Sequence, residues 1–328
     1  MYNKHSSFDR LQSNQRARER SRWHAVRDDV VLYFAFGSCG HALIEGRVID
    51  FQRERLATAA DRSLTNLRRS LRLIFNEERR HREVRLWMTN HEWHTVTDDE
   101  GYFRCELKNL AALEPGWHRI HADCGDATDS IGLLLVPPEN VHGLISDIDD
   151  TVLVSEVSSK RRLLLNTLLR NPLQRAVVSG VAQLYRTAAE RNPLPACAPL
   201  FYLSATPRQL HLPLQTILDH NGLPPGVLIT KRVTNDATSE PLRNQFAYKQ
   251  RKIEEILNLV KHVSFTLVGD DSEHDPEVFA EMRRLHPERI DAIWMRHVHP
   301  DAKRARLENQ LSLAELLQAQ TTSNQDAL

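Results

Sequence analysis

The sequence of 328 residues contains no apolar run that approaches the ~20 residues a membrane-spanning helix requires. Its N-terminus is polar and has no apolar core segment, so we expect no secretory signal. The cysteines form no CxxC pair and show no metal-ligand spacing; they are Cys39, Cys105, Cys124 and Cys197. These absences predict a protein of a reducing compartment. A cytoplasmic location fits best, and a peripheral association with a membrane stays compatible with it.

A net charge is also missing, because 43 Lys and Arg residues balance 43 Asp and Glu residues. No overall field points to nucleic acid, and no nucleic-acid partner is expected. The charge is uneven locally, since residues 1–27 hold seven Lys or Arg residues against Asp9 and Glu19. We interpret residues 1–29 as a basic, flexible, solvated arm. Attraction of this arm to anionic lipid is the alternative, which would give a peripheral membrane contact.

Short β-rich runs dominate the first half of the chain after this arm. The run YFRCEL at 102–107 alternates apolar and polar side chains, as a half-buried strand does. Residues 53–80 interrupt the strands with apolar residues at helical spacing. We therefore predict a small β-sandwich domain at 30–138 with a helical insertion at about 53–80, followed by a linker around VPPEN (136–140).

Past this linker, short apolar runs alternate with segments of helical periodicity. This alternation predicts an α/β domain, a parallel sheet with helices on both faces. Ligands bind such sheets beyond the carboxyl ends of the strands. We assign the domain to 139–300, and a C-terminal helix with a polar tail to 301–328. The apolar runs are GLISD (143–147), LFYLS (200–204), GVLIT (226–230), VSFTLVGD (263–270) and DAIWMR (291–296).

Acidic and hydroxyl side chains follow three of these runs and should meet at one edge of the sheet. At a single strand end such residues are explained by a turn or a helix cap, but three converging ends make that reading weak. Clustered carboxylates need a cation, and oxygen ligands without a His or Cys set favour Mg²⁺ over Zn²⁺. Because Mg²⁺ in such sites completes its shell with water and phosphate oxygens, we predict phosphate chemistry. The residues are Asp147, Asp149, Asp150, Thr151, Ser204, Asp270, Asp271 and Asp275.

These segments resemble a known family. D-x-D-x-T at 147–151, a strand-end Ser, a Lys and G-D-x-x-x-x-D resemble the four motifs of the haloacid dehalogenase phosphatase superfamily. The segments SDIDDTVLVSEVSSK, LFYLSATPRQL, YKQRKIEEIL and LVGDDSEHDPEVFAEM are similar to the actin-patch-type phosphatidate phosphatase catalytic-domain family. Bacterial members of that family carry a β-rich N-terminal region similar to 30–138. The resemblance covers about 30–300 and implies a haloacid-dehalogenase-like, Rossmannoid parallel sheet.

The resemblance implies a role for each residue of the first motif. Asp147 would be the nucleophile that attacks phosphorus, and it would also touch Mg²⁺. Asp149 lies two residues after Asp147, so the two side chains point to the same side of an extended chain. Asp149 would protonate the leaving alcohol and later deprotonate the attacking water, and it would also lie at the metal. Thr151 would supply a hydroxyl. The Asp150 side chain points to the opposite side of this segment. We therefore expect Asp150 to stabilise the loop after the strand and to tolerate replacement best of the three acids.

Phosphate binding is predicted for Ser204, Ala205 and Lys249. By the resemblance, Ser204 would hold a phosphoryl oxygen. Lys249 lies on an apolar helical stripe, where a buried lysine requires a negative partner such as Asp147 or the phosphoryl group. A lysine stem that runs along the surface to solvent is the structural alternative. Lys252 is the other candidate, at a less favourable angle on the same helix.

The third strand end leaves one assignment open. By the resemblance, Asp270 would be the main side-chain ligand of Mg²⁺. Asp275 fits the second acid of the G-D-x-x-x-x-D form, and Asp271 competes with it. A plain helix cap before Pro276 is the structural alternative for Asp275.

The sequence after Ser204 predicts a helix with Thr206 as its N-cap and Pro207 as its first residue. The N-terminus of that helix would offer N–H donors to phosphate, and Pro213 would interrupt the helix. The chain has Arg208 where the resembling family often has Trp, and Asp271-Ser272-Glu273 where the family often has Ser-Gly-Gln. Both departures concern the substrate and remove no catalytic group.

We therefore predict a Mg²⁺-dependent phosphatase that acts through an aspartyl-phosphate and hydrolyses phosphatidate or a related lipid phosphate monoester. The lipid substrate rests on the resemblance alone. One alternative keeps the chemistry but acts on a soluble sugar or nucleotide phosphate. The other is a membrane- or protein-binding module, in which the β domain and basic arm act and the catalytic domain is vestigial.

Overall fold

The computed structural model describes residues 28–50, 79–108, 110, 113–125, 129–154, 176–232, 245–272, 274–298, 307 and 310–325. The predicted basic arm and nearly all of the predicted helical insertion lie outside these residues. The chain divides into two compact units, and the division between the described parts falls between Pro138 and Glu139. Each unit is described by itself.

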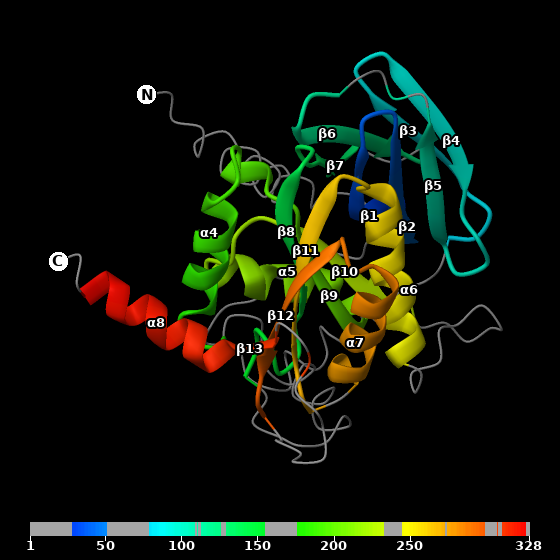
Figure 1. The fold of residues 1–328 in the computed structure, drawn as a ribbon. Helices are drawn as coiled ribbons and strands as arrows, with labels where there is room; N and C mark the ends of the chain where they lie inside the picture. The colour runs from blue at the N-terminus through cyan, green and yellow to red at the C-terminus, as the bar shows by residue number, and fades with distance from the viewer. Residues whose placement is uncertain are drawn as a thin grey trace, which may run out of the picture. The chain divides into compact units, whose positions relative to one another are not determined.

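The described strands of the first unit form one seven-stranded sheet in the order β4-β3-β6-β7-β1-β2-β5 (Figure 1). Its neighbouring strands are antiparallel, except that β1 and β7 run parallel. The strands are β1 (Asp28–Ser38), β2 (His41–Asp50), β3 (Glu83–Met88), β4 (His91–Val96), β5 (Tyr102–Lys108), β6 (Gly116–Asp123) and β7 (Ser130–Val136).

Alternation in the sequence decides which face of this sheet is buried. In β5, Phe103, Cys105 and Leu107 are buried, while the residues between them are exposed, as their alternation predicted. Val84 and Leu86 of β3 belong to the same apolar cluster, although β3 lies near the other end of the strand order. The sheet therefore curls around one core. A sandwich of two separate layers stays a prediction, because the described strands follow one continuous order.

The second unit contains a six-stranded sheet in which each neighbouring pair of described strands is parallel. The predicted parallel sheet is confirmed. Its order is β10-β9-β8-β11-β12-β13, so the order reverses between β8 and β11. Open α/β sheets bind ligands in the crevice at the carboxyl side of such a reversal. The strands are β8 (Val141–Asp147), β9 (Leu200–Pro207), β10 (Val227–Lys231), β11 (Val263–Asp270), β12 (Ile290–Arg296) and β13 (Gln310–Ser312).

Helices cover both faces of this sheet (Figure 1). One face packs against α4 (Val181–Glu190), α5 (His211–His220) and α8 (Leu313–Gln325), which share an apolar cluster with the strands. On the other side, α6 (Gln245–Leu259) and α7 (Asp275–Leu285) pack against each other, α6 against β9 and α7 against β11. Within the described part of the chain, no helix is both long enough and apolar enough to cross a membrane.

The predicted start of α5 is wrong. Strand β9 continues through Pro207, a short 3₁₀ turn follows, and α5 begins at His211 without a side-chain cap. Thr206 is therefore no N-cap. Pro213 falls in the first turn of α5, where the missing N–H removes no intrahelical hydrogen bond. The later start explains why this proline is tolerated.

Candidate metal and phosphate site

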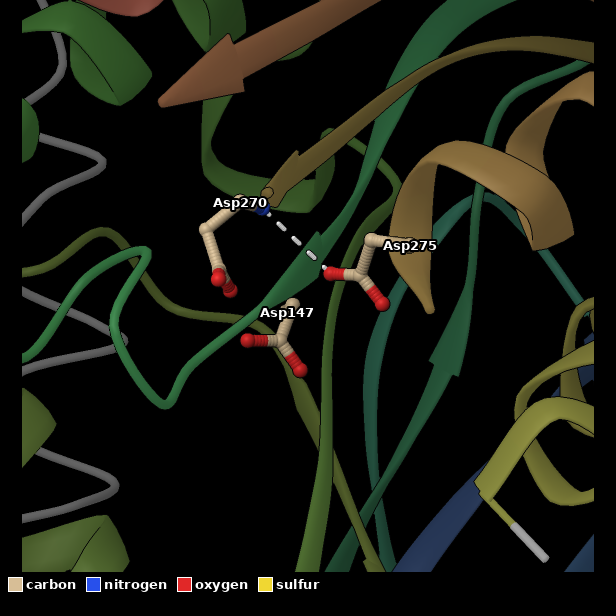
Figure 2. A group of neighbouring side chains, drawn as sticks. All are labelled: Asp147, Asp270 and Asp275. Atoms are coloured by element: carbon tan, nitrogen blue, oxygen red, sulfur yellow. Dashed lines mark hydrogen bonds between the residues drawn. The ribbon is translucent and has the colours of Figure 1, made fainter. Parts of the chain in front are cut away.

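Three buried carboxylates meet where the strand order reverses (Figure 2). Asp147 ends β8, Asp270 ends β11 and Asp275 begins α7. One oxygen from each of the three lies within 4.8 Å of the others, and none of the residues is more than 5% exposed. Neighbouring parallel strands end at the same edge, so the topology itself places Asp147 beside Asp270.

The approach of Asp275 to this edge depends on a glycine. A Cβ on Gly269 would lie 2.5 Å from Asp275 Oδ2 and would also press on the Phe279 ring. Without that Cβ, Asp275 can fold back over the strand end, where its Oδ2 accepts a hydrogen bond of 3.4 Å from the backbone N–H of Asp270. The first turn of α7 is thus held against β11.

Lys249 of α6 supplies a positive charge inside the cluster. Its Nζ lies 2.7 Å from Asp147 Oδ1 and also donates to Asp275 Oδ1. Lys252 instead pairs with Glu255 on its own helix, at 3.2 Å. Of the two lysines that the sequence proposed, the structure brings Lys249 to the carboxylates. The alternative of a stem that runs to solvent does not hold, because Lys249 is 3% exposed.

Burial dominates the electrostatics of the cluster. It raises the pKa of Asp147 well above its ordinary value; Lys249 acts in the opposite direction, and the neighbouring carboxylates add to the rise. It likewise raises the pKa of Asp275 to about 6. Burial lowers the pKa of Lys249, but Asp147 and Asp275 outweigh it and hold that pKa well above its ordinary value.

The ionised cluster lacks positive charge. Three carboxylates and one ammonium leave two negative charges uncompensated among these four side chains. A divalent cation would offset that excess, and a donor set made only of carboxylate oxygens suits a hard cation. The residues present therefore fit a divalent metal ion.

Polar neighbours orient Asp270 within the cluster. Thr151 Oγ1 donates to its Oδ2 at 3.2 Å. The backbone N–H of Ser272 donates to its Oδ1 at 2.7 Å, and the Ser272 hydroxyl also reaches this oxygen. Thr151 was predicted only as a hydroxyl donor, and the structure shows what it contacts. Ser272 was not predicted as a site residue, although it lies inside the G-D-x-x-x-x-D motif.

Asp149 faces the next strand end and lies outside the three-carboxylate group. Its Oδ2 accepts hydrogen bonds from Ser204 Oγ at 2.9 Å and from Thr206 Oγ1 at 3.2 Å. Ser204 Oγ in turn accepts the backbone N–H of Thr206 at 3.0 Å, and Ala205 lies between them in β9. Thr206, predicted as a helix cap, thus holds a carboxylate.

The structure separates the two acids between which the sequence could not choose. Asp271 Oδ1 accepts the backbone N–H of Val298 at 2.6 Å, and its Oδ2 lies 3.1 Å from His297 Nδ1. The side chain therefore points to the loop after β12, while Asp275 points into the cluster. Asp271 directly follows Asp270 in the chain, and successive residues of an extended segment point to opposite sides.

Asp150 serves the loop after β8 through its backbone. Its φ of 61° is in the left-handed region, and its carbonyl accepts a hydrogen bond from Arg296 Nη1. Val152 N–H and Leu153 N–H both return to Ile148 O at 2.9 Å and close this turn. Arg296 was not predicted, and nothing in its local sequence marks this contact. Asp and Asn tolerate the left-handed conformation better than most residues.

Replacement of the two competing acids should separate their roles. Asp275→Asn is expected to weaken the binding of a divalent cation, with Mg²⁺ as the test ion, at least about tenfold, because it removes a charged oxygen from the cluster. Asp271→Asn should leave Mg²⁺ affinity close to that of the unmodified protein. Isothermal titration with Mg²⁺ measures both. An equal loss in the two variants, or a loss in Asp271→Asn alone, would contradict the geometry.

The segment that carries this site matches a known family model. Residues 142–297 match the model described as "Phosphatidate phosphatase APP1, catalytic domain". The chain is 32% identical over 157 residues to "Phosphatidate phosphatase APP1" of Saccharomyces cerevisiae, covering 47% of this chain and 25% of that protein. It is 29% identical over 162 residues to "Uncharacterized protein C29B5.04c" of Schizosaccharomyces pombe, covering 49% and 26%. The chain thus spans about a quarter of the length of these relatives.

Two solved structures show a weak likeness to this chain. The "Structure of PhoD" has a TM-score of 0.30 at 7% identity, covering 62% of this chain and 38% of that one. The carbohydrate acetylesterase XAC1771 from Xanthomonas citri has a TM-score of 0.30 at 12% identity, covering 90% and 66%.

Proposed function

We propose that this chain is a phosphoric monoester hydrolase of the APP1 phosphatidate phosphatase type, with its catalytic domain in the second unit. One observation carries the proposal. The buried group of Asp147, Asp270 and Asp275, with Lys249 in contact, lies at the reversal of the strand order. All four residues fall inside the segment that matches the catalytic-domain model. The haloacid-dehalogenase-like fold named from the motifs is part of the same proposal.

Mg²⁺ is the ion that we propose for the three-carboxylate group. Asp147, Asp270 and Asp275 would hold it. Mg²⁺ takes oxygen ligands and usually retains water or phosphate oxygens, so a few carboxylates are enough to bind it. When bound, it supplies positive charge that stabilises the phosphoryl oxygens as charge develops on them.

The proposed reaction runs through an aspartyl-phosphate. A carboxylate oxygen of Asp147 attacks phosphorus while the bond from phosphorus to the substrate alcohol breaks, and a protonated Asp149 gives its proton to the leaving oxygen. Water then attacks the phosphorus of the aspartyl-phosphate, and Asp149 takes the proton from this water. The bond between phosphorus and Asp147 breaks, which releases inorganic phosphate and restores both carboxyl groups.

The neighbouring side chains support these two steps by position and charge. The hydroxyls of Ser204 and Thr206 both donate to Asp149 Oδ2, so they hold the proton-transferring group in place. Lys249 contacts Asp147 and can reduce the repulsion between that carboxylate and an incoming phosphate. The backbone N–H of Ala205 would donate to a phosphoryl oxygen, and the Ser204 hydroxyl would do so when it turns from Asp149 to the bound phosphate.

The substrate class is proposed from the name of the yeast relative, a phosphatidate phosphatase. We infer that this chain acts on phosphatidate or a related lipid phosphate, as a cytoplasmic enzyme that reaches membrane surfaces. Residues 1–27, with their excess of Lys and Arg, would favour contact with anionic lipid.

A substrate panel tests the proposal. The purified full chain with Mg²⁺ is expected to hydrolyse an aryl phosphate and phosphatidate in mixed vesicles, and EDTA should stop both reactions. Turnover of phosphatidate should follow its surface concentration in the vesicle. A higher kcat/KM for a soluble sugar or nucleotide phosphate would replace the lipid assignment. Vesicle binding without turnover of any phosphate would indicate a binding module.

A further inference from the structure

Tyr248 is a buried residue beside Lys249 that the proposed reaction leaves without a role. It is 2% exposed, and its hydroxyl donates to the backbone carbonyl of Ser204 at 3.2 Å. Lys249, the next residue of α6, contacts Asp147 at the end of β8. Two consecutive residues of one helix thus reach the ends of two neighbouring strands, one on the metal side of the site and one on the phosphate side.

A second buried lysine lies against the Tyr248 ring. Lys231 ends β10 and is 0% exposed, and its Nζ lies 5.0 Å from the centroid of that ring. The face of a tyrosine ring attracts a cation, most strongly when water is excluded. Strand β10 pairs with β9, and Thr230 lies opposite Ser204. Lys231 of β10 therefore contacts the Tyr248 ring, and the Tyr248 hydroxyl contacts the neighbouring strand β9.

The peptide that Tyr248 anchors is the one assigned to phosphate. The bond between Ser204 and Ala205 is planar and trans, so the Ser204 carbonyl and the Ala205 N–H point in opposite directions. A hydrogen bond on the carbonyl from α6 sets the rotation of this plane, and with it the direction of the N–H. Catalysis is sensitive to such rotations, because a misplacement of about 1 Å at a reacting group can lower a rate about 100-fold.

We propose that Tyr248 and Lys231 act as one positioning pair that holds the Ser204–Ala205 peptide in the orientation that receives the phosphoryl group. The proposal rests on the function proposed above and adds two residues to it. Neither side chain reacts with the substrate. Both act through the backbone of β9.

Tyr248→Phe is the direct test, since it keeps the ring and its contact with Lys231 and removes only the hydroxyl. We expect kcat for an aryl phosphate to fall about 10- to 100-fold, because the peptide loses its anchor. Inorganic phosphate should also become a weaker competitive inhibitor and bind more weakly in calorimetry with Mg²⁺ present. Weaker phosphate binding is a readout that a purely structural role would not change.

Tyr202→Phe is the matched control. Tyr202 lies on the same strand as Ser204, is also 2% exposed, and donates its hydroxyl to the Pro224 carbonyl at 2.8 Å. Pro224 precedes β10, so this contact is at the amino edge of the sheet, away from the site. Both tyrosine variants should have a lower melting temperature than the wild type. Only Tyr248→Phe should lose kcat and phosphate affinity.

Lys231 is tested by charge removal and by rescue. Lys231→Met should lower kcat, as Tyr248→Phe does. Lys231→Arg keeps the cation and should retain most of the wild-type kcat. The double variant Tyr248→Phe/Lys231→Met should be no slower than the slower single variant, because residues that act as a unit are not additive. If Lys231→Met does not fold, the comparison of Lys231→Arg with Lys231→Gln replaces it.

Each outcome decides between the proposals. If the wild type is active and Tyr248→Phe keeps its kcat and its phosphate affinity, the positioning pair is wrong. The proposed phosphatase function would still stand. Multiplicative losses in the double variant overturn the action of the two residues as a unit. A wild type that neither turns over phosphate esters nor binds phosphate overturns the proposed function, and the positioning pair with it.

Discussion

Asp147→Asn should abolish turnover of every phosphate monoester, with a fall in kcat of at least about 10³-fold, because an amide cannot form the aspartyl-phosphate and losing one member of a catalytic unit removes nearly all of its effect. Single-turnover assays with an aryl phosphate and Mg²⁺ measure this loss. Trapping of phosphate on the protein during turnover should succeed in the wild type and fail in this variant.

The lost activity should not come from unfolding. Asn has nearly the shape of Asp, and it removes one of three buried carboxylates that repel each other in the metal-free protein. Burial, Asp275 and Asp270 all raise the pKa of Asp147, which shows that its ionised form is disfavoured there. The melting temperature of Asp147→Asn in EDTA should therefore equal or exceed that of the wild type.

Asp150→Asn is the control for this variant. Asp150 lies three residues after Asp147, outside the three-carboxylate group, and asparagine accepts its left-handed φ of 61°. We expect wild-type kcat from Asp150→Asn. The mechanism would be wrong if Asp147→Asn kept its turnover, and the assignment within the motif would be wrong if the two variants lost similar activity.

Lys249→Met should be the most destabilising single change at the site. The substitution keeps an apolar stem and removes the ammonium that contacts both Asp147 and Asp275. Breaking a buried ion pair by removing one partner lowers the free energy of unfolding by roughly 3–5 kcal/mol, because the remaining charge is buried without compensation. Urea denaturation in EDTA near neutral pH measures the change. Activity should be lost as well.

Lys252→Met is the matched variant on the same helix. Lys252 is 4% exposed, and it pairs with Glu255, three residues along α6. The Glu255 side chain is 15% exposed, whereas that of Asp275 is 0% exposed, so water can partly solvate the carboxylate that Lys252 leaves behind. We expect a smaller loss of stability and no loss of kcat. Similar destabilisation by the two variants would contradict the charge balance proposed for the cluster.

Added Mg²⁺ should distinguish Lys249→Met further. A ligand that binds only the folded protein raises its stability by mass action, and the uncompensated carboxylates of the variant should gain from a divalent cation. Saturating Mg²⁺ is expected to recover part of the stability that Lys249→Met loses. If Mg²⁺ recovers none of it, the cluster does not bind the ion.

Most strands and helices of the described residues could be predicted from apolar periodicity. Strand β4 was missed because it contains no fully buried position: His91, Trp93 and Thr95 are half-buried, and the residues between them are exposed. A strand of this kind leaves little apolar signal. The start of α5 was placed too early, because Thr206 and Pro207 have the residue types of a helix N-terminus but are held in β9. Pairing with β10 overrode this local preference.

The sequence by itself determined that Asp147, Ser204 and Asp270 would meet at one edge, because parallel strands end on the same side of their sheet and each of these residues lies at the end of an apolar run. Only the tertiary structure decided between Asp275 and Asp271, and between Lys249 and Lys252. It also decided that Thr206 holds Asp149 and that Tyr248 anchors Ser204. The direction of a side chain after a turn, and the rotation of a helix against a sheet, are set by packing between segments far apart in the sequence. For these residues, that packing is the contact of α6 with β9 and of α7 with β11.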